Sequence, residues 1–282
     1  MKSQKESVFV TQLLPILLTV VIFVFLTTVT YAAIYVLNTF VGRGQDILTK
    51  VRFYDVLVGL TIYLKTSVDF GILIGNLMTK YNHWRDRIAI EIGTALGNGL
   101  GTILILSIWD YFRTVKWLLV LMIVIASLVL FKLAEEGLDH AKEKEKDLPH
   151  GFRKLMRGFE KIVLSINKAL SPVMSKLVPN LSMRPKPNLT FWGLFSVAFT
   201  VPFILGLDDF AGYVPLFSVV NVFGFAVGVY LGHMILNMAL YLSPTKTITI
   251  VKNPYISVAG SVAFVGIALW GLYEAFNLAF IH

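Results

Sequence analysis

The chain contains no cysteine and few charged residues. None of its 282 residues is Cys, and Asp, Glu, Lys and Arg together make up 15% of them, below the about 25% that is typical of soluble proteins. The missing cysteines exclude disulfides, thiolate metal sites and thiol catalysis. Apolar side chains form 56% of the chain, and the mean hydropathy is +0.73. This composition is typical of an integral membrane protein.

The sequence also lacks the motifs of nucleotide-driven and hydrolytic enzymes. It contains no Walker A loop, no nucleophile elbow and no zinc-binding His-Glu-x-x-His pattern. We therefore expect neither an ATP-driven pump nor an intramembrane hydrolase. No enzyme activity and no resident cofactor are predicted.

Apolar segments long enough to cross a ~30 Å hydrocarbon core recur along the chain. They predict an all-α polytopic membrane protein with about seven transmembrane helices. The first segment is interpreted as a retained span, because its apolar run is longer than the core of a signal peptide. The predicted spans are 8–40, 54–78, 88–109, 117–131, 189–218, 222–242 and 255–281.

A polar stretch, 132–188, separates the fourth and fifth predicted spans. Within it, Arg and Lys residues alternate with apolar residues at helical spacing, a pattern suited to a helix that lies on an anionic leaflet. A helix hairpin that packs on itself is the alternative. The apolar positions are Leu155, Phe159, Ile162, Val163, Ile166 and Leu170.

The distribution of Lys and Arg predicts the orientation in the membrane. The stretch 132–188 is the most basic segment and should be cytoplasmic. The N-terminus then lies inside and His282 outside, with the protein in a cell (inner) membrane. The net charge of +8 accordingly predicts contact with the lipid bilayer and its anionic headgroups, and no binding of nucleic acid.

The two halves of the apolar region resemble each other. Ser-Val-Asp-Phe-Gly around Asp69 matches Asp-Asp-Phe-Ala-Gly around Asp209, and Gly-x-x-Leu-Gly precedes both Asn98 and His233. Because the second and fifth spans run in opposite directions, we predict two inverted three-helix repeats. The predicted parts are a first span and loop (1–53), repeat one (54–131), the basic loop (132–188) and repeat two (189–282).

Ionisable residues inside predicted spans are the candidate site residues, since a charge there is costly unless it serves a function. Asp69 and Asp209 occupy equivalent places in the two repeats and are the predicted principal ligands. Asp208 lies beside Asp209, between Pro202 and Pro215. This composition predicts a broken helix that lines a cavity, with an extracellular turn as the alternative.

Further polar side chains complete an oxygen-rich set with one imidazole. Such a set suits hard and borderline divalent cations such as Mn²⁺, Mg²⁺ or Ca²⁺, and a carboxylate or His233 would allow exchange against protons. Lys65 lies one turn before Asp69, where it either pairs with Asp69 or holds a substrate group. The predicted assisting ligands are Asn98, His233 and Glu91, and the predicted substrate or gating residues are Lys65, Thr66, Ser67 and Asn237.

The repeated Asp-Phe pair, at Asp69-Phe70 and Asp209-Phe210, resembles the lysine exporter superfamily, which includes cadmium-resistance, manganese-exporter and TerC-type families. The resemblance covers the region from about Tyr54 to Ile281. It implies three-plus-three inverted repeats with an aspartate in the first helix of each, and the export of metal ions or, less often, of amino acids.

These features predict a secondary transporter that exports a divalent metal cation as its substrate, manganese among the candidates. One alternative is an exporter of an amino acid or small organic cation, in which Lys65 holds a carboxylate. Another is a membrane scaffold or assembly protein without transport, which acts through residues 132–188. Whether the chain forms a homo-oligomer is left open.

Overall fold

The computed structural model describes residues 13–41, 46–143, 145–177, 189–211, 214–218 and 220–281. Within these ranges the side chains of 41, 69, 147, 169–177, 204–211 and 218 are not part of the description. The described residues form helices and connecting segments, with no strand among them. The predicted all-α fold class is thus confirmed for the described residues.

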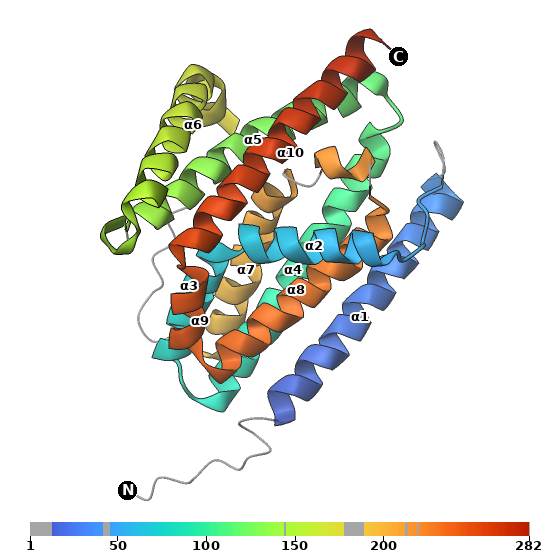
Figure 1. The fold of residues 1–282 in the computed structure, drawn as a ribbon. Coiled ribbons are helices and arrows are strands. Elements are labelled where there is room, and N and C mark those ends of the chain that lie inside the picture. The colour runs from blue at the N-terminus through green and yellow to red at the C-terminus, as the bar shows by residue number, and fades with distance from the viewer. Residues whose placement is uncertain are drawn as a thin grey trace, which may run out of the picture.

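Figure 1 shows the order of the helices along the chain. The long ones are α1 (Leu14–Val36), α4 (Trp84–Phe112), α5 (Lys116–Lys142), α6 (His150–Leu177), α7 (Phe191–Ala211), α8 (Val222–Leu242) and α10 (Pro254–Phe280). Shorter ones are α2 (Phe53–Thr66), α3 (Val68–Lys80) and α9 (Pro244–Val251). Single turns η2 (Leu37–Val41), η3 (Glu145–Asp147) and η4 (Val214–Ser218) complete the set.

Among the described residues, five helices are long and apolar enough to cross a membrane, or six if α2 and α3 count as one bent span. The predicted span 54–78 is not one straight helix. The segment breaks at Ser67, and the two helices are bent by 64°. Ser67 has φ −82° and ψ 20°, outside the α-helical region, so the chain changes direction there.

In the segment with two prolines, the long helix ends between them, at Ala211. Helix α7 runs through Pro202 and both aspartates to Ala211, and a single turn follows at Val214–Ser218. A proline inside a helix removes one hydrogen bond and bends the helix without always ending it. The predicted break between Pro202 and Pro215 therefore does not fall at Asp208 or Asp209.

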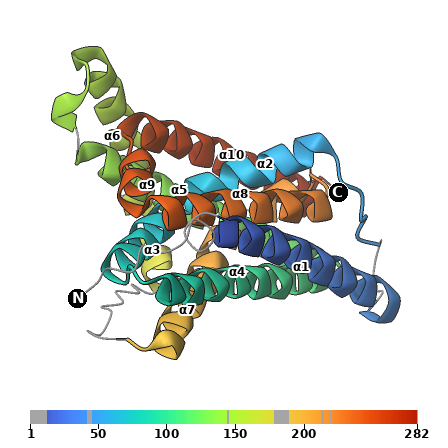
Figure 2. The same ribbon diagram turned by 90° about the horizontal axis from the view of Figure 1, so that it is seen from below.

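Three helix pairs form the centre of the bundle: α4 with α7, α2 with α8, and α5 with α10. Helix α1 lies at one edge against α8 and α4, and α6 lies at the opposite edge beside α5 (Figures 1 and 2). Short helix α9 packs on α3. The main apolar core lies between these helices, and a second one joins α5, α6 and α10.

Glycines set the close contact of the first two pairs. A Cβ on Gly97 or Gly228 would overlap the backbone carbonyl of Phe199 in α7 or of Val56 in α2. A Cβ on Gly93 would lie 2.6 Å from the carbonyl oxygen of Phe195. The helix backbones therefore touch at these positions, as in other membrane bundles with small residues at the interface.

Helix α5 continues beyond the predicted end of the fourth span, and α6 returns along it. The Asn167 side chain of α6 donates to the Phe131 carbonyl of α5 at 2.9 Å, and Glu160 pairs with Lys142. One face of α6 is thus buried in an antiparallel hairpin with α5. Leu155 and Ile162 remain 68% and 59% exposed, and contact of this helix with anionic headgroups stays a prediction.

Gly97→Ala should destabilise the protein, because its Cβ has no room against the Phe199 carbonyl and must push α4 away from α7. Overpacking of this kind costs about 1–3 kcal/mol, more than the ~1 kcal/mol that alanine gains in helix propensity. The measurement is thermal unfolding of the purified protein in detergent.

Gly266→Ala is the matched control, since no atom lies within 4 Å of a Cβ built on Gly266. This variant should unfold at the wild-type temperature or above it. A Gly97→Ala protein as stable as Gly266→Ala would contradict backbone contact between α4 and α7.

Candidate functional site

Buried polar side chains from α2, α4 and α8 meet in the apolar interior. From α4 come Glu91, Thr94 and Asn98, which recur on one helix face. From α8 come His233 and Asn237, one turn apart. All five are at most 7% exposed. We call these five residues, with Tyr63 of α2, the polar cluster.

Hydrogen bonds connect most of the polar cluster into one chain. The Asn237 side-chain nitrogen donates to Thr94 Oγ1 at 2.9 Å and lies 2.9 Å from His233 Nε2. On the other side of the ring, His233 Nδ1 lies 2.7 Å from the Tyr63 hydroxyl. The chain thus runs from α4 through α8 to α2.

The direction of these bonds follows from the chemistry of Asn237. An amide nitrogen has hydrogens but no free lone pair, so His233 Nε2 must accept the bond from it. The proton of the neutral ring then resides on Nδ1, which donates to the Tyr63 hydroxyl. This assignment rests on the position of the Asn237 amide.

Glu91 is the carboxylate of the cluster. Its residue exposure is 0%, and neither carboxyl oxygen has a hydrogen-bond partner among the described residues. Asn98 Nδ2 and Asn237 Oδ1 are likewise buried without a partner there. A carboxylate in such a place needs a proton or a cation, because an uncompensated buried charge is strongly unfavourable.

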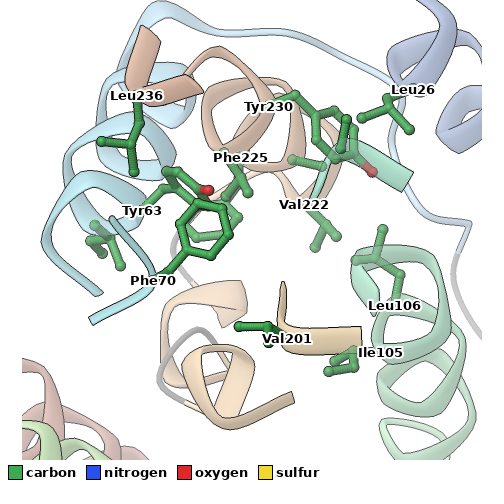
Figure 3. Close-up of a cluster of buried hydrophobic side chains, with 14 of the residues drawn as sticks. Leu26, Tyr63, Phe70, Ile105, Leu106, Val201, Val222, Phe225, Tyr230 and Leu236 are labelled. Atoms are coloured by element: carbon green, nitrogen blue, oxygen red, sulfur yellow. The ribbon is translucent and has the colours of Figure 1, made fainter. Parts of the chain in front are cut away.

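Apolar rings surround the imidazole end of the cluster. The His233 ring lies 5.7 Å from that of Tyr63 and 6.0 Å from that of Phe70, measured between centroids. Figure 3 shows Tyr63 and Phe70 next to each other at the junction of α2 and α3, among other apolar side chains. These apolar side chains keep water away and so strengthen electrostatic interactions in the cluster.

Four of the predicted site residues belong to the polar cluster: Glu91, Asn98, His233 and Asn237. Ser67 is buried at the α2–α3 break, with its hydroxyl unpaired among described residues. The side chains of Asp69, Asp208 and Asp209 lie outside the described residues, as does His282. Their predicted role as ligands therefore stays a prediction.

Lys65 and Thr66 donate hydrogen bonds to backbone carbonyls. Lys65 Nζ donates to the carbonyl oxygens of Ile256 and Ser257 in α10, each at 3.1 Å. The Thr66 hydroxyl donates to the Tyr63 carbonyl at 3.2 Å. Lys65 thus faces α10, and its predicted pairing with Asp69 is not tested.

Sequence reasoning missed two polar contributions. Thr94 joins the helices through Asn237, and its position between Glu91 and Asn98 on one helix face was the available signal. Asp55, fully buried, binds the Arg52 guanidinium at 2.8 and 2.9 Å and accepts from the Asn221 backbone nitrogen at 3.0 Å. This contact ties the start of α2 to the start of α8.

Among the described side chains, no three His, Asp or Glu residues come together as a metal site would require. No protein-family model, curated protein or solved structure matches this chain. Function is therefore inferred from the polar cluster and the helix arrangement alone.

Glu91→Gln should leave the protein at least as stable as wild type, because the amide removes a buried charge that has no described partner. Asn237→Leu should lower the free energy of unfolding by about 1–3 kcal/mol, since Thr94 and His233 each lose a hydrogen-bond partner. Thermal unfolding in detergent at neutral pH compares the two.

The order of the two variants is the decisive readout. If Glu91→Gln proved as damaging as Asn237→Leu, the carboxylate would have to be held by specific hydrogen bonds. The description of Glu91 as uncompensated would then be wrong.

Proposed function

We propose that the chain is a secondary membrane transporter for cations, with Glu91 and the polar cluster at its binding site. The observation that carries the proposal is a fully buried carboxylate without a described partner in a helix long enough to span a membrane. Intramembrane carboxylates of this kind mark ion and proton pathways.

The helix pairing supports inverted repeats. Suppose that α2–α3, α4 and α5 form one repeat, and that α7, α8 and α10 are their counterparts in the other. Exchange of the two repeats then converts the α2–α8 contact into the α7–α4 contact. The α5–α10 contact converts into itself. These are the three main contacts of the bundle. With α1 before the two repeats, this correspondence gives seven spans. Transporters with inverted repeats bind their substrate where the repeats meet.

The glycine contacts support the same correspondence. Gly93 and Gly97 of α4 face the carbonyls of Phe195 and Phe199, and Gly228 and Gly232 of α8 face those of Val56 and Leu60. Val56 and Leu60 thus correspond to Phe195 and Phe199. The same offset between the two repeats aligns Asp69 with Asp208. The Asp-Phe match in the sequence had instead aligned Asp69 with the next residue, Asp209.

Contacts at the ends of the bundle show which loops lie together. Arg87 at the start of α4 donates to the Tyr241 carbonyl at the end of α8, and Lys252 pairs with Glu143 after α5. These loops gather at one end, which we assign to the cytoplasm under the positive-inside rule. Arg52 and Arg113 line a common pocket at the other end.

A divalent metal ion is the substrate class that the residue set favours. Helix α3, which carries Asp69, contacts α4, α7 and α8, so Glu91, Asp69 and the aspartates of α7 belong to helices in mutual contact. Carboxylate and amide oxygens are ligands for Mn²⁺, Mg²⁺ and Ca²⁺. The His233 chain provides a route for protons in exchange, with export as the direction.

The test is ion flux into liposomes that contain the purified protein, with Mn²⁺, Mg²⁺, Ca²⁺, Zn²⁺ and Cd²⁺ offered in turn and a pH dye inside. Glu91→Gln, Asp69→Asn and Asp209→Asn should each reduce flux of the accepted ion by about tenfold or more, because a site charge in low dielectric is worth over ~1.4 kcal/mol.

Glu274→Gln is the matched control, a carboxylate in α10 outside the polar cluster, and should transport like wild type. Flux of none of these ions by folded protein would reject the metal substrate. A flux that Glu91→Gln leaves unchanged would reject the site. Amino-acid flux under the same conditions would favour the organic-substrate alternative.

A further inference from the structure

Helices α5 and α10 contact each other at two Gly–Ser pairs of the same kind. A Cβ on Gly137 of α5 would overlap the Ser261 hydroxyl of α10. In the other pair the helices change roles, and a Cβ on Gly271 of α10 would overlap the Ser127 hydroxyl of α5. Each serine hydroxyl donates to a carbonyl one turn before it in its own helix. The two serines are as far apart along the chain as the two glycines, so exchange of the proposed repeats converts one pair into the other.

The segments that follow the first helix of each repeat lie in different places. In repeat two, η4 packs on α5 and α10, with Pro215 against Gly271. In repeat one the corresponding segment belongs to α3, which packs mainly on α9 (Figures 1 and 2). This contact is close, because a Cβ on Gly75 of α3 would lie 2.7 Å from the Ile248 side chain of α9. Equivalent segments of the proposed repeats thus occupy two different positions.

The bend at Ser67 accounts for this difference. Helices α2 and α3 are bent by 64° there, whereas α7 continues as one helix from Phe191 to Ala211. The offset given by the glycine contacts makes Gly206 of α7 the counterpart of Ser67. Glycine permits backbone conformations that other residues avoid, and sharp kinks in helices fall at a few kinds of position, glycine among them. Helix α7 can therefore bend where repeat one is bent.

On α5, the place that corresponds to the Pro215 contact holds a lysine and a small recess. The recess measures about 20 Å³ and lies beside Gly137, lined by residues of α5, α10 and the junction of α2 and α3. Lys65 Nζ lies 3.8 Å from a Cβ built on Gly137. It donates to the Ile256 and Ser257 carbonyls of α10. Lys65 therefore ties the end of α2 to α10 in this structure, at the place that would receive α3.

We infer that the two positions exchange. In a second state, α3 leaves α9 and packs on α5 and α10 beside Gly137, while η4 leaves Gly271 and α7 bends at Gly206. In the present structure η4 covers the α5–α10 pair near the end assigned to the outside, and α3 would cover it near the cytoplasmic end. Such gating opens a site between inverted repeats to one side at a time. The inference rests on the proposed function, because it assumes the inverted repeats.

A pair of introduced cysteines tests the exchange, since the chain has none of its own. Asn76→Cys is placed on α3, at the counterpart of Pro215, and Glu136→Cys on α5, next to Gly137. Asn76 is exposed, and the Glu136 side chain is 43% exposed, so both variants should fold. A short bis-methanethiosulfonate reagent should link the two thiols in liposomes and stop flux of the accepted ion. A reductant should cleave the link and restore flux.

The matched control combines Asn76→Cys with Leu121→Cys. Leu121 is 51% exposed and lies on the same helix as Glu136, roughly 22 Å farther along it at about 1.5 Å per residue. This pair should form no link, and its flux should stay at the level of wild type with or without the reagent.

A further variant tests the bend in α7. Gly206→Ala should slow linking of Asn76→Cys to Glu136→Cys by about fivefold, from the helix propensity that alanine adds over glycine. Gly193→Ala, in the first turn of the same helix, should leave linking unchanged. Linking that Gly206→Ala does not slow would overturn a bend at Gly206.

The exchange and the proposed function fail in different ways. Protein that transports while the Asn76→Cys and Glu136→Cys thiols never link would overturn the exchange, and so would a linked pair that still transports. Absence of ion flux in wild type would reject the proposed function. Linking of the same pair would then still support two positions of α3.

Discussion

Helix backbones touch at glycine in the α4–α7 and α2–α8 pairs, and the buried polar cluster depends on this contact. Gly97 and Gly228 leave no room for a Cβ against the facing carbonyls. The close approach brings Tyr63 within hydrogen-bond distance of His233. It also fixes the two helices that present Glu91 and Asn237. If the paired helices lay farther apart, these hydrogen-bond partners would separate, and several buried polar groups would lose their hydrogen bonds.

Much of the helical framework could be predicted from the sequence, because span length and apolar composition are local properties. Helices α8 and α10 begin and end within one residue of the predicted segments 222–242 and 255–281. Glu91, Asn98, His233 and Asn237 were also identified, since polar residues in apolar helices are conspicuous. All four are buried, and their role as ligands stays a prediction.

The features that the sequence did not predict depend on interactions between distant segments, which the periodicity of apolar residues does not encode. The break at Ser67 comes without Gly or Pro at that position, as α2 packs on α8 while α3 packs on α9. The continuation of α5 to Lys142 depends on the α6 face that covers it. Nothing in the local sequence distinguishes Thr94 from other helix residues, because its partner Asn237 lies 143 positions away.

The orientation of Asn237 has a consequence for the protonation of His233. Its amide directs both hydrogens outward, toward Thr94 and toward Nε2 of His233, so the imidazole has no acceptor on that side for a second proton. Protonation of Nε2 therefore requires the amide to rotate and present its oxygen. The charge of the imidazole and the orientation of the amide thus change together.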